Sequence, residues 1–245
     1  MKRLPYFILC LLFLLSAYTL LAQEQQLKVT KIAPKVYVHT SYKQLGAVVY
    51  PSHGLIVSTK DGVVLIDTGW GNAPTEQLLE WIANNLKQPV KVCIPTHFHD
   101  DKMGGISVLQ KRGIPVVASV LTARLAAEHN AGTPDITFAT DTTLTAGGQQ
   151  IEVHYPGAGH TTDNIVVYLP KHKLLFGGCL VKDIQAKSLG NIADADLDNW
   201  PETIRGLQKR YTKAKIVVPS HGPWGSKAAL EHTLYLLGQA TKKQP

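Results

Sequence analysis

Short runs of apolar, β-branched residues alternate along this chain with segments of helical periodicity. In the first half these runs predict strands over 36–38, 54–57, 63–67, 92–95 and 116–118, with a hairpin turn at 60–62. Apolar residues at helical spacing predict helices over 75–86, 105–111 and 122–129, the first of them capped by Asn72 or Thr75. This order of elements is typical of an α/β fold.

A second set of elements begins near Thr142. Its apolar runs predict strands over 151–155, 165–169, 174–176 and 216–218. Pro201 suits the first turn of a helix that reaches 211, and Ser226 caps a last helix to 237. The chain therefore consists of two α/β halves with helices for both faces, and since no repeat of 20–50 residues is found, a solenoid is not expected.

Composition agrees with a globular protein. Of the 245 residues 44% are hydrophobic and 18% are charged, which excludes intrinsic disorder, and the 20 glycines and 14 prolines show no collagen period. Three cysteines are too few for a disulfide framework. The net charge of +7 permits an acidic partner. The basic residues are scattered and no nucleic-acid-binding motif is found, so no nucleic-acid partner is expected.

The first 22 residues are typical of a secretory signal peptide. Lys2 and Arg3 precede an almost wholly apolar run, and Ala22 is a suitable last residue before a polar segment. The alternative is an uncleaved membrane anchor, because the apolar run is near the length that spans a bilayer. Leu9 before Cys10 disfavours a lipoprotein signal. Cleavage would leave 23 basic and 18 acidic residues, a net charge of +5, and no later stretch of membrane-spanning length.

The candidate chemistry lies in loops that follow predicted strands. His97, His99 and Asp101 come directly after the strand that ends at 95. If the loop folds back, this spacing can bring two imidazoles and a carboxylate onto one metal ion, and the mixture of nitrogen and oxygen donors suits zinc. A hydrogen-bonded turn is the alternative for this cluster taken alone.

Three further residues of metal-ligand type stand in the same relation to a strand. His160, Cys179 and His221 each follow an apolar run, next to glycine or proline. Because α/β folds place their sites in loops at one end of a sheet, this repeated coincidence favours a metal centre. The remaining histidines and one cysteine are expected to be structural: His39, His53, His129, His154, His172, His232 and Cys93.

These motifs resemble those of the metallo-β-lactamase superfamily, and within it the zinc-dependent class B β-lactamases whose second metal site contains cysteine. They occur in family order and cover essentially the whole chain after the first 22 residues. They are Leu65-Ile66-Asp67-Thr68-Gly69-Trp70, Thr96-His97-Phe98-His99-Asp100-Asp101-Lys102-Met103-Gly104-Gly105, Gly159-His160-Thr161-Thr162-Asp163-Asn164, Gly178-Cys179-Leu180-Val181-Lys182, Leu189-Gly190-Asn191 with Asp194-Ala195-Asp196, and His221-Gly222. The resemblance implies one domain over 23–245, folded as a four-layer αββα sandwich.

The resemblance also implies two zinc ions. The first would be held by His97, His99 and His160, and the second by Asp101, Cys179 and His221. Three imidazoles suit an open catalytic site, whereas a thiolate and a carboxylate make a more anionic neighbour. With the carboxylate, the thiolate and a bound hydroxide set against two Zn²⁺, the centre carries a charge of about +1 and should attract an anionic substrate.

The reaction implied by the resemblance is hydrolysis of the amide bond of β-lactam antibiotics (penicillins, cephalosporins and carbapenems), which confers resistance. The nucleophile would be a zinc-bound hydroxide, available near neutral pH. Asp101 would orient it, Lys182 would pair with the substrate carboxylate and Asn191 would bind and polarise the substrate carbonyl. The signal peptide then implies a periplasmic protein without stable membrane association, expected to be a monomer.

Three features have less specific interpretations. Residues 42–47 occupy the place of the family's mobile flap, and an ordinary hairpin loop is the alternative. Trp70 is expected either as an apolar wall of the substrate pocket or as a core side chain. Asp67 is interpreted as support for the metal loops and not as a ligand.

Two other functions compete with β-lactam hydrolysis. Thioester hydrolases such as glyoxalase II, and the phosphodiesterases and nucleases, have a histidine after the motif aspartate and an aspartate that bridges the metals. Here Lys102 and Cys179 stand at those two places. A secreted zinc-binding or zinc-storage protein would keep the ligands but leave Lys182 and Asn191 unexplained. The β-lactamase prediction is therefore favoured.

Overall fold

Residues 26–241 are described by the computed structural model, so the predicted signal peptide lies outside the described residues. The first half of the chain forms a five-stranded sheet in sequential order. Its strands are β1 (Lys28–Ala33), β2 (Val36–Leu45), β3 (Val48–Ser58), β4 (Val63–Ile66) and β5 (Val90–Ile94). All neighbours are antiparallel except β4 and β5, which are parallel.

The second half forms another five-stranded sheet. From one edge to the other its strands are β12 (Ile216–Pro219), β11 (Leu174–Gly178), β10 (Val166–Leu169), β9 (Gln149–His154) and β8 (Thr142–Ala146). Only β11 and β12 pair in parallel. Between these two sets of strands in the sequence, β6 (Val117–Ser119) and β7 (Ile136–Phe138) form a small separate sheet.

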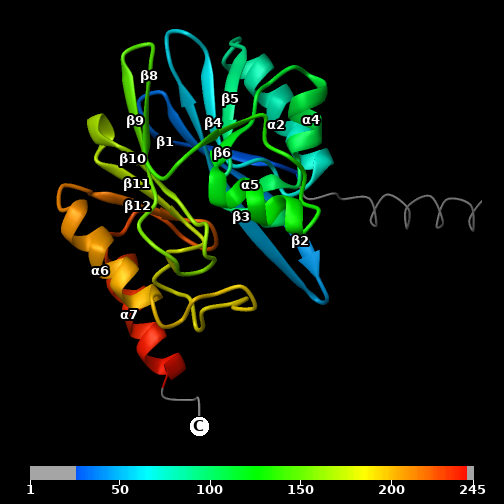
Figure 1. Ribbon diagram of the computed structural model, residues 1–245. Helices are drawn as coiled ribbons and strands as arrows, with labels where there is room; N and C mark the ends of the chain where they lie inside the picture. The colour runs from blue at the N-terminus through cyan, green and yellow to red at the C-terminus, as the bar shows by residue number, and fades with distance from the viewer. Residues whose placement is uncertain (1–25, 242–245) are drawn as a thin grey trace, which may run out of the picture.

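Helices cover the outer face of each sheet (Figure 1). The first sheet is covered by α2 (Asn72–Asn85), α4 (Ile106–Lys111) and α5 (Val120–Glu128), and the second by α6 (Trp200–Arg210) and α7 (Ala228–Thr241). Two short elements, α3 (Asp100–Met103) and the 3₁₀ turn η1 (Pro170–His172), complete the set. Within residues 26–241 no helix is both long and apolar enough to cross a membrane.

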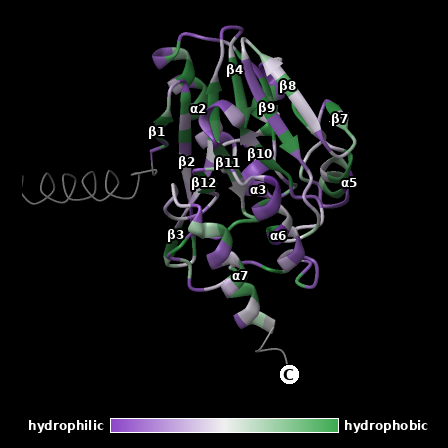
Figure 2. Ribbon diagram, turned by 90° about the vertical axis from the view of Figure 1, so that its left-hand side faces the viewer, coloured by the Kyte–Doolittle hydropathy of each residue, from purple (hydrophilic) through white to green (hydrophobic). Residues whose placement is uncertain are grey.

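The inner faces of the two sheets share one apolar core. Leu55 and Ile66 from the first sheet and Val167 and Phe176 from the second are all fully buried in it. Figure 2 shows these apolar strands in the interior, with polar residues toward the outside. Because apolar side chains on both sides of each sheet need cover, the chain forms helix, sheet, sheet and helix layers. The predicted αββα sandwich is confirmed.

Most of the predicted elements are present, but one cap prediction is wrong. Helix α2 begins at Asn72 with Gly71 as its N-cap, at φ 102°, and neither Asn72 nor Thr75 caps it. Instead the hydroxyl of Thr75 donates to the carbonyl of Gly71 at 2.8 Å. A Cβ at Gly105 would overlap this hydroxyl, so glycine is required there by close packing and not by an unusual φ.

The hairpin of β2 and β3 is much longer than predicted. Strands were expected only over 36–38 and 54–57, yet the pairing continues to Leu45 opposite Val48 around a tight turn at Gly46. The predicted flap, residues 42–47, is therefore the end of this hairpin. Its tip exposes apolar side chains, including Leu45 at 47% and Tyr50 at 43%, which no sheet neighbour covers.

One buried histidine makes folding sensitive to acid. His39 in β2 is fully buried and donates a hydrogen bond from Nε2 to the carbonyl of Ile66 at 3.2 Å. Burial lowers the pKa of His39 from 6.5 to about 3. Because the unfolded chain binds this proton more readily, the stabilisation by neutral His39 is complete above pH 6.5 and is lost progressively as the pH falls toward 3.

We therefore expect His39→Gln, which cannot titrate, to flatten this pH dependence. Between pH 7.5 and 5.5 the free energy of unfolding of the parent protein should fall by about 1.4 kcal/mol more than that of the variant. Urea unfolding of both proteins at the two pH values measures this difference. Equal losses in the two proteins would contradict the burial of a neutral His39.

Candidate metal centre

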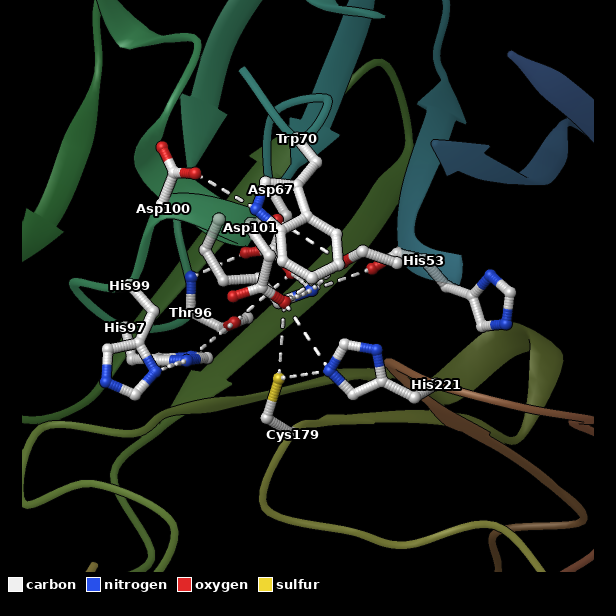
Figure 3. A network of polar contacts seen from close by, with 12 residues as sticks. His53, Asp67, Trp70, Thr96, His97, His99, Asp100, Asp101, Cys179 and His221 are labelled. Carbon is white, nitrogen blue, oxygen red and sulfur yellow. Dashed lines mark hydrogen bonds and ion pairs between the residues drawn. The ribbon is translucent and has the colours of Figure 1, made fainter. Parts of the chain in front are cut away.

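The first three predicted ligands, His97, His99 and His160, lie close together, and the first two of them are shown in Figure 3. Nε2 of His97 is 3.2 Å from Nδ1 of His99. The ring of His160 lies 5.1 Å from each of theirs, centre to centre. Three imidazole rings at these spacings can turn nitrogens toward one metal ion.

The other three predicted ligands form a second group directly beside the first. The Sγ atom of Cys179 lies 3.5 Å from Oδ2 of Asp101 and 3.4 Å from Nε2 of His221. That nitrogen is 3.6 Å from the same carboxylate oxygen. The two groups are also joined, because ligand atoms of His97, His160 and Cys179 lie within 4.8 Å of one another. The six residues therefore form one continuous cluster of groups that could hold metal.

The ends of the central strands place these side chains. The 97–101 segment follows β5, His160 lies between β9 and β10, Cys179 follows β11 and His221 follows β12. Hydrogen bonds between loops of the two halves hold them together: the N–H of Phe98 donates to Asp163 at 3.0 Å and that of Ile165 donates to the Thr96 carbonyl at 2.9 Å. The six residues that the sequence places after strands are therefore neighbours in space.

Asp67, which follows β4, is hydrogen-bonded to Thr96, which follows β5, next to the candidate metal ligands. Its carboxylate accepts hydrogen bonds from the N–H of Thr96 at 2.7 Å and from the Thr96 hydroxyl at 3.2 Å. Burial raises the pKa of Asp67 to about 6, against the opposing effect of Lys102. Asp67 holds the residue that precedes His97, which is the supporting position that the sequence indicates.

The outer nitrogens of the imidazoles fit the binding of zinc. Nδ1 of His221 lies 2.6 Å from the carbonyl of Pro51, Nε2 of His99 lies 2.8 Å from Asp194, and Nδ1 of His97 lies 3.4 Å from the hydroxyl of Thr96. An oxygen on the outer nitrogen can hold the N–H there, which leaves the inner nitrogen with a lone pair for a metal. The donor set of imidazoles, carboxylate and thiol therefore fits zinc.

Protonation of the cluster also suits a cation. Burial lowers the pKa of His97, His160 and His221, so these rings favour the neutral form that binds metal. Burial alone would raise the pKa of Asp101, but the Lys102 ammonium opposes it, and the pKa lies well below its ordinary value. Asp101 is therefore a carboxylate.

Cys179 differs from the other candidate ligands because, with no metal ion bound, its side chain is a protonated thiol and not the thiolate that binds metal. Burial, followed by the Asp101 carboxylate, raises the pKa of Cys179 to about 12. A thiolate is the form that binds zinc, so binding must release this proton and becomes tighter as the pH rises.

A cavity of about 820 Å³ opens in front of the two groups. Among the predicted site residues, its lining includes Trp70, His99, Asp101, His160, Cys179, Lys182, Asn191 and His221. The hairpin of β2 and β3 and the long segment that follows β11 project on this same side (Figure 1). Leu45 and Tyr50 of the hairpin reach the cavity. Its lining thus combines the candidate ligands with apolar and charged side chains.

The three predicted substrate contacts occupy different positions in this cavity. Lys182 is only 9% exposed, and its ammonium lies 5.3 Å from the ring centre of Trp200, so it is not a solvated surface lysine. Asn191 is exposed and accepts a hydrogen bond from the N–H of Ala193 at 3.2 Å. Trp70 is part-buried and donates from Nε1 to Asp100 at 3.0 Å, so the alternative of a core tryptophan is wrong.

Comparison with known proteins identifies the family. The family model described as the metallo-β-lactamase superfamily matches residues 48–226. The chain belongs to the metallo-β-lactamase superfamily. The metallo-β-lactamase type 2 of Bacillus sp. (strain 170) is 42% identical over 211 residues, which cover 86% of this chain and 82% of the relative. That of Bacteroides fragilis is 38% identical, with 87% and 86% covered.

Solved structures of the family have the same fold. The metallo-β-lactamase from Pontibacter korlensis is 68% identical with a TM-score of 0.86, covering 87% of this chain and 99% of that one. The FIM-1 metallo-β-lactamase from Pseudomonas aeruginosa, solved in a mono-zinc form, is 35% identical with a TM-score of 0.84, covering 89% and 98%. The candidate centre of this chain offers the imidazole, carboxylate and thiol donors that suit zinc.

Two residues near the centre have surroundings that the sequence does not indicate. Lys102 is fully buried, and its ammonium lies 3.1 Å from Asp101 and 3.4 Å from Asp67 while it donates to the Ser52 hydroxyl at 2.9 Å. Its position next to the motif aspartate was the only signal. His129, which is expected to be structural, lies in the lining of the cavity, with its ring 4.6 Å from that of Phe98.

Proposed function

We propose that this protein is a zinc-dependent β-lactamase that hydrolyses the amide bond of penicillins, cephalosporins and carbapenems and so confers resistance to them. One observation carries the proposal: two adjacent sets of zinc ligands lie on a cavity large enough for a small molecule, with a buried lysine in its lining. Two Zn²⁺ with one carboxylate and one thiolate make a cationic pocket, which suits a substrate that bears a carboxylate.

We assign one zinc to His97, His99 and His160, and a second to Asp101, Cys179 and His221. When bound, zinc supplies Lewis acidity and lowers the pKa of water toward 7, so that a nucleophile forms at neutral pH. The shared contacts between the two groups, through His97 and Cys179, support two ions side by side. The chain's own residues then have to orient the water and the substrate.

Asp101 is proposed to orient the attacking water. Oδ2 of this carboxylate faces Cys179 and His221, and Asp101 also forms a group with His97 and His99 whose ligand atoms lie within 4.8 Å of one another. Asp101 therefore lies between the two ligand groups and can accept a hydrogen bond from the water. The amide nitrogen of Asn191 is proposed to donate to the carbonyl oxygen, where negative charge develops. Its own Oδ1 is already occupied by the N–H of Ala193.

Lys182 and Trp70 are proposed to bind the rest of the substrate. The Lys182 ammonium, buried beside Trp200, can pair with the substrate carboxylate in a charge-assisted hydrogen bond. Trp70 forms a side wall, and its hydrogen bond to Asp100 fixes the indole ring. The pairing supplies an anchor for one end of the substrate while the amide faces the metal ligands.

Hydrolysis of a chromogenic cephalosporin by the purified protein with added zinc tests the proposed function. We expect rapid ring opening that a zinc chelator abolishes and that excess zinc restores. The same preparation is offered a thioester and a phosphodiester. No cephalosporin turnover with zinc present, together with turnover of either alternative substrate, would assign this site to another branch of the superfamily.

Removal of the lysine ammonium should weaken substrate binding more than the chemical step. Lys182→Ala is expected to raise KM for a carboxylate-bearing cephalosporin about ten-fold or more, with little change in kcat, because the ion pair forms equally in the ground and transition states. Steady-state kinetics measures both constants. The control Lys209→Ala removes an exposed lysine on α6. An unchanged KM for Lys182→Ala would contradict its assignment.

We further propose that residues 1–22 are cleaved and that residues 23–245 act as a single-domain monomer in the periplasm, without membrane association. The composition of the first 22 residues and the core shared by the two sheets support this. Mass spectrometry of the protein from a periplasmic extract, followed by light scattering, should give a chain that starts near residue 23 and the mass of one copy.

A further inference from the structure

A long irregular segment carries two of the proposed substrate contacts. Residues 179–199, between β11 and α6, contain no helix or strand, yet Lys182 and Asn191 both lie in them. The end of this segment is attached to the loops of the first ligand group. The N–H of Asp196 donates to the carbonyl of Gly159 at 2.8 Å, next to His160, and the carboxylate of Asp194 meets His99.

The contact between Asp194 and His99 is short and partly shielded from water. Oδ2 of Asp194 is 2.8 Å from Nε2 of His99, and the side chains are 36% and 17% exposed. A neutral imidazole has one N–H and one lone pair. A carboxylate on Nε2 keeps the N–H there, so the lone pair is on Nδ1, the nitrogen that lies 3.2 Å from Nε2 of His97.

The other two imidazoles of the first group have no such partner within residues 26–241. Nδ1 of His97 has only the hydroxyl of Thr96, at 3.4 Å. Nδ1 of His160 is buried without a hydrogen-bond partner there. In this part of the chain, His99 is thus the one member of the group whose orientation depends on a carboxylate, and that carboxylate belongs to the segment that carries Asn191.

We propose that Asp194 is a positioning residue that couples the first zinc site to the order of residues 189–196. It fixes the tautomer and the direction of His99 for the metal, and bound zinc in turn holds Asp194 and the segment around it in place. Such coupling is reciprocal: what strengthens zinc binding through Asp194 must stabilise the segment by the same amount. The inference rests on the proposed zinc centre, but it makes no use of a substrate.

Zinc affinity is the first test. Wild type, Asp194→Asn, Asp194→Ala and the control Asp198→Asn, which alters an exposed carboxylate of the same segment, compete for zinc with a chromogenic chelator. Loss of an outer partner of a ligating histidine costs about 10- to 100-fold in metal affinity. We expect that loss for Asp194→Ala, a smaller one for Asp194→Asn because its amide oxygen can still accept from Nε2, and none for Asp198→Asn. Wild-type affinity for Asp194→Ala would overturn the proposal.

Hydrogen exchange separates positioning from a merely structural role. In the wild-type protein, zinc should slow exchange of the amides in 189–196, where Ala195 and Asp196 donate to backbone carbonyls. In Asp194→Ala, zinc should still protect residues 97–101 but no longer 189–196. Equal protection of 189–196 in both proteins would contradict the coupling. A protein that shows the coupling but opens no cephalosporin would instead contradict the proposed function alone.

Discussion

Replacing Lys102 by methionine should lower the free energy of unfolding by about 3–5 kcal/mol, more than any single surface change. The Lys102 side chain is fully buried between the carboxylates of Asp67 and Asp101. Their attraction outweighs the effect of burial and raises the pKa of Lys102 above its ordinary value, so the buried group is an ammonium. Methionine keeps the unbranched stem but leaves two buried carboxylates without their cation. Urea unfolding of the zinc-free proteins, in the presence of a chelator, measures the loss, because zinc would otherwise supply a cation to Asp101.

A second substitution shows whether charge causes this loss. Asp67→Asn in the Lys102→Met background removes one of the unpaired carboxylates and keeps an oxygen that can accept from the N–H of Thr96. The double variant should therefore be more stable than Lys102→Met alone. Lys111→Met, an exposed site at the end of α4, is the matched control and should change stability by less than about 0.5 kcal/mol. If Lys102→Met unfolds like that control, the network does not stabilise the fold.

Cys179→Ser should reduce the zinc content from two tightly held ions per chain to one. A serine hydroxyl is a far poorer zinc ligand than a thiolate, and the other two ligands of that group, Asp101 and His221, would remain. Metal analysis after dialysis against a weak chelator gives the stoichiometry. The three imidazoles of the first group are unchanged by this substitution, so one ion should persist.

The chain contains a matched control for this exchange. Cys93 is a buried free cysteine within β5, on the side of the first sheet that packs against α2 and α4. Cys93→Ser makes the same chemical change in the core, and it should cost stability but leave two zinc ions bound. Two tightly held ions in Cys179→Ser would show that Cys179 is not a ligand.

Periodicity predicts the elements well where side chains are buried on a regular face. The central strands and the helices of the two outer layers are buried in this way and were predicted. The apolar pattern does not define strands β1, β7 and β8, because their residues are mostly exposed or half-buried and give a weak apolar signal. The apolar pattern also does not predict the outer end of the β2–β3 hairpin. There the two strands are held by backbone pairing that continues beyond the core, where few side chains are buried.

The site was predictable as far as local spacing and strand ends define it. The six proposed ligands are brought together because their loops leave the same edge of two facing sheets. Contacts between distant segments could not be foreseen. Whether Lys102 is buried depends on how Ser52 in β3 and Asp67 after β4 pack around it, and the pairing of Asp194 with His99 joins residues 95 positions apart.

Crystals grown with excess zinc, measured on both sides of the zinc absorption edge, test the dizinc assignment most directly. We expect two anomalous peaks in the cavity, one contacted by His97, His99 and His160 and the other by Asp101, Cys179 and His221. A peak held by other side chains, or no peak at the second group in the presence of excess zinc, would contradict the assignment.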